Sequence, residues 1–132
     1  GTVHCVEFAQ RTMRELIEHV CSYRANISPI LADARHPSSY RALVPVADTI
    51  YCDVAQPEQA RILADNADLF LKDSGSVMIA VKSRSVDVTL TPSSVFLREK
   101  RTLVERGFEI VDTVRLEPYE KDHAMIVARR HG

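Results

Sequence analysis

A chain of 132 residues, 45% hydrophobic and 27% charged, is long enough to bury one core, and one compact domain is the working assumption. The formal net charge of -1 excludes a global positive field that binds nucleic acid unaided, so an RNA partner would need other chains to hold it. No stretch approaches the roughly 20 apolar residues of a membrane span, and the N-terminus lacks the layout of a secretory signal, which predicts an intracellular protein with no membrane partner.

The cysteines and histidines do not group into a disulfide framework or a metal site. Cys5, Cys21 and Cys52 are odd in number, widely spaced and set in apolar surroundings, which predicts reduced core residues. The sequence has no C-x-x-C motif and no paired histidine spacing of the kind that indicates zinc. We therefore predict no metal.

The first part of the chain alternates predicted strands with predicted helices. A strand over Val3–Val6 is followed by an amphipathic helix and then by a strand over Ile27–Ala32. The apolar face of that helix carries Met13, Leu16, Ile17, Val20 and Cys21. A turn from Arg35 to Tyr40 leads into a short helix that continues through Leu43.

The middle of the chain repeats the same alternation. The strand Val46–Cys52 runs into Asp53, and a helix is predicted from Pro57, a favourable first helical residue, to about Leu71. The segment Asp73-Ser74-Gly75 is expected to end this helix. An acid placed where a parallel strand stops lies where α/β sheets bind ligands, although Asp53 could instead only cap the following helix.

The last part closes the predicted sheet. An unbroken apolar strand over Val77–Val81 stops at Lys82, and after a polar loop Thr91-Pro92 opens a helix that Gly107 ends in the left-handed conformation. Strands over Phe108–Leu116 and Ala124–Ala128, joined by a tight turn at 117–122, form an antiparallel hairpin. The whole pattern predicts a three-layer α/β sandwich with a mostly parallel sheet.

Five ionisable residues fall at strand ends that share one edge of this predicted sheet. Four of them directly follow strands, and the fifth begins the return strand of the hairpin: Glu7, Asp33, Asp53, Lys82 and His123. Turns are polar everywhere, so chance also places polar residues at strand ends, and Lys82 and His123 could be a surface lysine and a turn residue.

The first two strand ends have the residues of an adenosine site. Glu7 can accept hydrogen bonds from ribose hydroxyls, and Phe8 can cover one face of an adenine. Asp33 can accept a hydrogen bond from the exocyclic amine of adenine, while the Ala34 N–H donates a hydrogen bond to the adenine ring. The alternatives are a solvated turn residue for Glu7, a core aromatic for Phe8, and a local turn with Arg35 for Asp33.

The glycines argue against a dinucleotide enzyme. The four glycines are Gly1, Gly75, Gly107 and Gly132, and none forms the Gly-rich strand-to-helix turn that binds such a cofactor. A nicotinamide-dependent dehydrogenase could also use Glu7 for ribose, but the sequence after Asp53 gives it no support.

Four segments stand in one order over nearly the whole chain: Val6-Glu7-Phe8, Asp33-Ala34-Arg35-His36-Pro37, Asp53-Val54-Ala55-Gln56-Pro57 and Leu116-Glu117-Pro118-Tyr119-Glu120-Lys121-Asp122-His123. In register and order they resemble fibrillarin, the 2′-O-methyltransferase family of box C/D ribonucleoprotein particles. The third segment and the Leu-Glu-Pro-Tyr-Glu part of the fourth are specific to that family.

The resemblance implies a Rossmann-like, S-adenosylmethionine-dependent methyltransferase fold and assigns roles to residues. By that resemblance Glu7 and Phe8 hold the ribose and adenine of the cofactor, Asp33 and Ala34 read the adenine edge, and Asp53, Val54, Ala55 and Gln56 border the methionine moiety. The family has a catalytic tetrad of lysine, aspartate, lysine and histidine. Its last three members match Asp53, Lys82 and His123.

The resemblance also implies a setting. The expected activity is guide-RNA-directed 2′-O-methylation of ribose in ribosomal RNA, with guide RNA, target RNA and scaffold proteins of the particle as partners. The expected location is the nucleolus in a eukaryote or the cytoplasm in an archaeon. Eukaryotic relatives suggest a second activity on protein glutamine. A non-catalytic structural subunit of an RNA particle is the remaining alternative.

The chain departs from the family pattern at its front. Family members carry, before the position of Gly1, a further strand with a Gly-rich cofactor loop and the first tetrad lysine. We therefore expect residues 1–132 to be a partial methyltransferase domain that lacks a central strand, and we expect it to be inactive alone.

Overall fold

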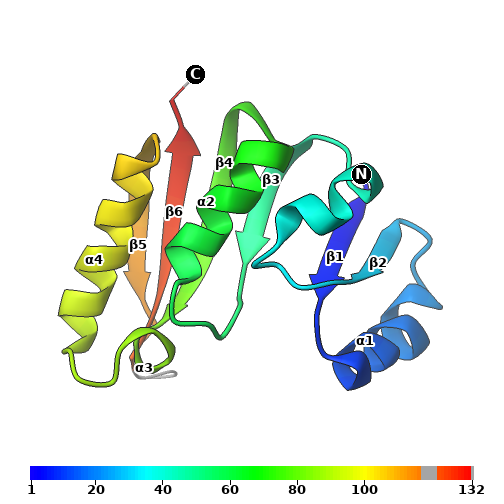
Figure 1. Ribbon diagram of the computed structural model, residues 1–132, viewed down its shortest axis with the longest axis horizontal. Coiled ribbons are helices and arrows are strands. Elements are labelled where there is room, and N and C mark those ends of the chain that lie inside the picture. The colour runs from blue at the N-terminus through cyan, green and yellow to red at the C-terminus, as the bar shows by residue number, and fades with distance from the viewer. Residues whose placement is uncertain (117–121, 132) are drawn as a thin grey trace. The chain divides into compact units, whose positions relative to one another are not determined.

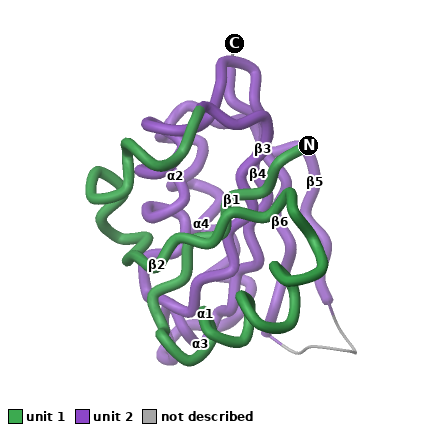
Figure 2. Tube along the Cα trace, turned by 90° about the vertical axis from the view of Figure 1, so that its right-hand side faces the viewer, with its two compact units in different colours: residues 1–45 green, residues 46–132 purple. Residues whose placement is uncertain are grey.

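The strands of the computed structural model, which describes residues 1–116 and 122–131, fall into two sheets (Figure 1). The chain divides into two compact units, residues 1–45 and residues 46–132, which Figure 2 shows in two colours. Among the described residues, no helix has the length and apolar character needed to cross a membrane.

The first unit is built on two parallel strands. β1 (Val3–Glu7) pairs with β2 (Ile27–Leu31) along their full length, so both predicted strands are confirmed to within a residue. The connection consists of α1 (Gln10–Leu16) and the π-helix η1 (Ile17–Cys21), and the 3₁₀ helix η2 (Pro37–Leu43) follows β2. On the predicted apolar face of the helix only Met13 is buried, so most of that face is not core in this unit.

The second unit is a four-stranded mixed sheet. Its strands are β3 (Ala47–Cys52), β4 (Leu71–Lys82), β5 (Phe108–Arg115) and β6 (His123–Arg130), in the order β3-β4-β6-β5. β3 and β4 are parallel, and β6 is antiparallel to both β4 and β5. The predicted C-terminal hairpin is therefore confirmed, although residues 117–121 of its turn lie outside the described residues.

Two helices cover one face of this sheet (Figure 1). α2 (Gln59–Phe70) packs on β3 and β4, and α4 (Pro92–Glu105) packs on β5, β6 and α2. Between them lies a core that includes the fully buried Leu63, Val77, Ile79, Val81, Val95, Leu103 and Ile126. Full burial of one such side chain contributes about 1.5–3 kcal/mol, so the carboxyl end of β4 is firmly held against the helices.

The helix boundaries of α4 follow their sequence signals. The Thr91 side chain accepts a hydrogen bond from the Ser94 N–H at 3.2 Å, and Gly107 has a φ of 95°, the left-handed conformation expected after a helix. The polar loop predicted after Lys82 contains one short helix, α3 (Ser83–Val86).

The end of α2 predicted near Leu71 is confirmed to within a residue, but its predicted start at Pro57 and its predicted stop signal Asp73-Ser74-Gly75 are wrong. The helix begins at Gln59, and Pro57 lies in the preceding turn. It ends at Phe70, and the segment Asp73-Ser74-Gly75 lies inside β4, which is twelve residues long. The strand absorbs these turn-forming residues because its register with β3 shifts there and Ser74 adopts a φ of 62°.

The predicted single sheet and the predicted core cysteines also need correction. No ladder joins β1 to β3 among the described residues, so each is an edge strand of its own sheet. All three cysteines are free, but only Cys52 is buried, and Cys5 and Cys21 are half-buried.

Candidate functional site

The second unit brings together the three residues predicted to be catalytic. Lys82 is the last residue of β4, and its partner across the antiparallel ladder is His123, the first residue of β6. Residues directly opposite each other in such a ladder project from the same face, about 5 Å apart. Asp53 directly follows β3, and the Lys82 Nζ donates to its carbonyl oxygen at 3.1 Å and also to its carboxylate Oδ1.

The alternative reading of Asp53 as a helix cap is wrong, and that of Lys82 as a surface lysine stays open. The N-cap of α2 is Glu58, so Asp53 does not cap that helix. Its carboxylate instead forms an ion pair with Lys82, whose side chain is only 24% exposed, against 48% for Asp53. The carboxylate thus holds the Lys82 ammonium group in one position at the strand end.

The start of β6 is held by contacts that the sequence analysis missed. The Ser83 N–H donates to the Asp122 carbonyl at 2.9 Å, and the Arg84 Nε donates to the Asp122 carboxylate at 2.8 Å. Asp122 has a φ of 65°, which an aspartate tolerates better than most residues. Together these contacts fix the residue directly before His123. The only sequence signal for them is that Arg84 closely follows Lys82 and Asp122 precedes His123.

The neighbouring thiol does not add a nucleophile. Cys52 lies directly before Asp53 and is buried, and this burial raises the pKa of its thiol. It therefore stays protonated at neutral pH. The described residues contain no group of three or more metal-binding side chains.

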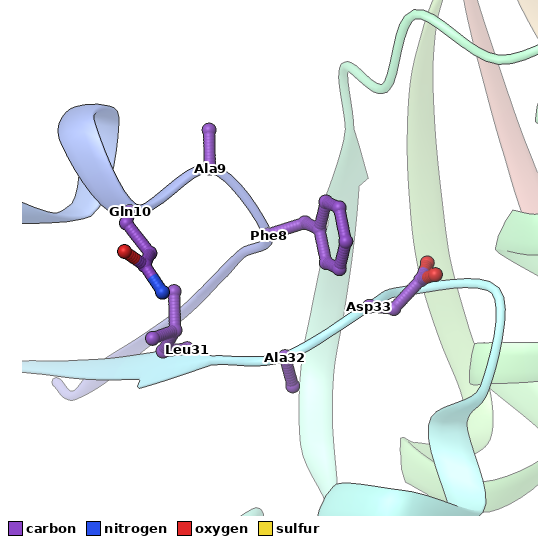
Figure 3. Close-up of a pocket in the computed structure, with 6 residues that line it drawn as sticks. All are labelled: Phe8, Ala9, Gln10, Leu31, Ala32 and Asp33. Carbon is purple, nitrogen blue, oxygen red and sulfur yellow. The ribbon is translucent and has the colours of Figure 1, made fainter.

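The first unit has an open hollow of about 430 Å³ at the ends of β1 and β2. It is lined by Phe8, Ala9, Gln10, Leu31, Ala32 and Asp33 (Figure 3). The Phe8 side chain extends from the end of β1 toward the side on which the Asp33 carboxylate lies (Figure 3). Phe8 is 68% exposed, so the alternative of a core aromatic is wrong.

The acids of this unit make local hydrogen bonds. Glu7 is the last residue of β1 and accepts the Ala9 N–H at 3.2 Å. Asp33 accepts the Arg35 N–H at 2.9 Å and its guanidinium Nη2 at 2.7 Å, and these bonds lower the pKa of Asp33 to about 2. The local turn with Arg35 is therefore present. The ribose role of Glu7 and the adenine role of Asp33 and Ala34 stay predictions.

The loop between β3 and α2 contains the other predicted cofactor residues. Val54 packs partly against the core, Ala55 is exposed and Gln56 is half-buried. Their contact with a methionine moiety stays a prediction.

The fold of this chain is shared with a class of methyltransferases. The N-methyltransferase NodS from Bradyrhizobium japonicum superposes with a TM-score of 0.72 at 14% identity, over 99% of this chain and 74% of that one, and further structures of S-adenosylmethionine-dependent methyltransferases superpose similarly. The fold is therefore that of the S-adenosylmethionine-dependent methyltransferases. The fibrillarin family model matches residues 1–132, and the chain belongs to the fibrillarin family.

Individual members of the family are similar over nearly the whole chain. The fibrillarin-like rRNA/tRNA 2′-O-methyltransferase of Staphylothermus marinus is 59% identical over 129 residues, which are 98% of this chain and 55% of the relative. The structure of Aeropyrum pernix fibrillarin with natively bound S-adenosyl-L-methionine has a TM-score of 0.86 at 53% identity, over 97% and 55% of the two chains. The fibrillarin/Nop5p complex has a TM-score of 0.93 at 41% identity, over 98% and 61%. The chain thus spans a little over half the length of these relatives.

Proposed function

We propose that this chain is part of an S-adenosylmethionine-dependent methyltransferase that transfers a methyl group to a ribose 2′-oxygen of RNA. The observation that carries the proposal is the Lys82–Asp53 ion pair with His123 directly opposite Lys82, in a member of the fibrillarin family. The names of the similar proteins support the rRNA substrate.

The chemistry requires alignment of two atoms and removal of one proton. When bound, S-adenosylmethionine would supply a sulfonium methyl group, whose carbon the 2′-oxygen would attack in line while the sulfur leaves as a neutral thioether with the electrons of the broken carbon–sulfur bond. Lys82, held in place by Asp53, is positioned to interact with the attacking oxygen. His123 orients the hydroxyl or shares its proton. Alignment contributes the largest share, several kcal/mol in well-oriented systems.

The residues of the first unit fit an adenosine group. The exposed ring of Phe8 borders the hollow and offers a face for stacking on a base. Asp33 lies on the same hollow, but both of its oxygens accept hydrogen bonds from Arg35, so it would receive an exocyclic amine only when the Arg35 guanidinium turns away. Glu7 would receive the ribose hydroxyls, Ala34 the adenine edge, and residues 53–56 the methionine part.

The finer parts of the proposal concern the setting. We propose guide-RNA direction, a target rRNA and a box C/D particle from the resemblance to the family, and a scaffold protein is favoured because a relative forms a complex with Nop5p. The net charge of -1 agrees with RNA that is presented by other chains. A nucleolar or cytoplasmic location and a second activity on protein glutamine stay predictions.

We further propose that residues 1–132 alone are inactive. The family's Gly-rich cofactor loop and first tetrad lysine are not found within them. β1 and β3 are edge strands of their own sheets in the described part of the chain, and each can therefore accept another parallel strand.

Calorimetry with S-adenosylmethionine tests the proposal, on residues 1–132 and on the complete protein. Binding only by the complete protein is expected. Binding by residues 1–132 would contradict the proposal that they lack a complete cofactor site. The complete protein is then assembled with guide RNA and scaffold protein, and methyl transfer to the target ribose is measured. Assembly without transfer would favour a structural subunit and overturn the enzymatic proposal.

A further inference from the structure

Gln59, the first residue of α2, has a fully buried side chain with 0% exposure. A buried amide without partners is costly, so its hydrogen bonds indicate what it does. Its Nε2 donates to the Val54 carbonyl and to the Ala80 carbonyl, the latter at 3.1 Å, and its Oε1 accepts the Lys82 N–H at 3.0 Å. Both donor hydrogens are used. The reverse orientation of the amide would place its oxygen against two carbonyls and is excluded.

These partners lie where the β3–β4 ladder stops. The last pair of that ladder is Cys52 with Ile79, and the chain after β3 then turns away. In a parallel pair, a residue donates to the residue before its partner and accepts from the residue after it. The Gln59 amide donates to Ala80 and accepts from Lys82, so it replaces one peptide group opposite Val81.

The hydrogen bond from Gln59 to the Val54 carbonyl connects the same amide to the chain segment that carries Asp53. Val54 directly follows Asp53, and its carbonyl accepts the second hydrogen of the Gln59 Nε2. One side chain thus bonds the backbone next to Asp53 and the backbone of Lys82. The Lys82 ammonium in turn reaches the Asp53 carbonyl at 3.1 Å. The amide therefore links the two backbone segments that carry these residues.

We propose that Gln59 is a positioning residue that sets Lys82 against Asp53 by extending the parallel ladder with its side-chain amide. The link to catalysis rests on the proposed methyltransferase function. The role of Gln59 in positioning Lys82 against Asp53 is independent of that function.

The test uses Gln59→Met in the complete protein, because methionine keeps the length and apolar volume but removes all three hydrogen bonds. The matched control is Ile62→Val, which perturbs the buried side of the same helix without touching the site. Crystal structures of both variants are compared. We expect the distance from Lys82 Nζ to the Asp53 carbonyl to exceed about 3.5 Å in Gln59→Met and to stay hydrogen-bonded in Ile62→Val. An unchanged contact in Gln59→Met would overturn the proposal.

The kinetic readout separates positioning from general destabilisation. We expect Gln59→Met to lower kcat for methyl transfer roughly 10- to 100-fold, with the Kd for S-adenosylmethionine little changed. Ile62→Val should keep kcat, as should Ile62→Ala, a larger truncation at the same buried position with a loss of thermal stability comparable to that of Gln59→Met. Should Gln59→Met fail to fold, Gln59→Asn replaces it, because its amide is one methylene too short to reach both β4 and Val54, and the same losses are expected. Full kcat in a folded variant would overturn the role. If the wild type transfers no methyl group, the proposed function fails, and the Lys82–Asp53 distance still decides the positioning role.

Discussion

Replacement of Lys82 by methionine separates the contribution of the Lys82–Asp53 pair to stability from its contribution to chemistry. Methionine keeps most of the apolar stem and removes the ammonium group. The two side chains are 24% and 48% exposed, and ion pairs in such surroundings contribute about 0.2–1 kcal/mol. The free energy of unfolding should therefore fall by about 1 kcal/mol or less. A group that acts on the reacting hydroxyl contributes far more, roughly 10²- to 10⁴-fold in rate.

The matched control is Lys72→Met. Lys72 is on the same strand, β4, and its Nζ forms an ion pair with Asp48 on β3 at 2.8 Å, away from the site. Both variants are measured by urea denaturation and by single-turnover methyl transfer in the assembled particle. We expect small losses of stability in both and loss of transfer only in Lys82→Met. A fall of less than tenfold in Lys82→Met, or an equal fall in Lys72→Met, would refute the catalytic assignment.

Three further outcomes follow from the site and the core. Phe8→Ala should weaken S-adenosylmethionine binding by the complete protein roughly 5- to 100-fold by calorimetry, the range for loss of one base stack, with little change in stability because the ring is exposed. Arg35→Ala should return the pKa of Asp33 from about 2 toward its ordinary 3.8, measured by carboxyl ¹³C NMR titration, and an unchanged pKa would refute the role of Arg35. Burial raises the pKa of Glu99, so the native state binds its proton more tightly than the unfolded chain does, and stability is lost as pH rises above the ordinary 4.5. Glu99→Gln should lack this fall in urea denaturation between pH 4 and pH 7.

The parts of the fold that the sequence predicted are those with local signals. The Thr91 cap and the left-handed Gly107 depend on a few neighbouring residues, and both are as expected. The turn residues Asp73-Ser74-Gly75 misled because β4 pairs with β3 on both sides of them, and this long-range pairing overrides their local preference.

In the candidate site, too, some contacts could be predicted from the sequence and others could not. The contact of Asp53 with Lys82 could be predicted because the ends of parallel strands share an edge. The role of Gln59 could not, because its three partners are separated from it by five to 23 residues and only the folded backbone brings them together. In the sequence, a glutamine at the start of a helix is interpreted as an ordinary polar helix residue.

The antiparallel ladder between β4 and β6 couples the position of His123 to the burial of the core, so an error in strand register would affect both. Seven consecutive pairs run from Ser76 with Arg129 to Lys82 with His123. Side chains alternate between the two faces of a strand, so a slip of one residue would place Ala124 or Asp122 opposite Lys82 and turn the imidazole to the other face. Such a slip would also expose Ala124, Ile126 and Ala128, which are now fully buried. The alternation of apolar residues that makes β6 a core strand therefore also fixes the face on which the His123 imidazole lies. A molecule with the wrong register would lose both the Lys82–His123 pairing and the burial of its core residues.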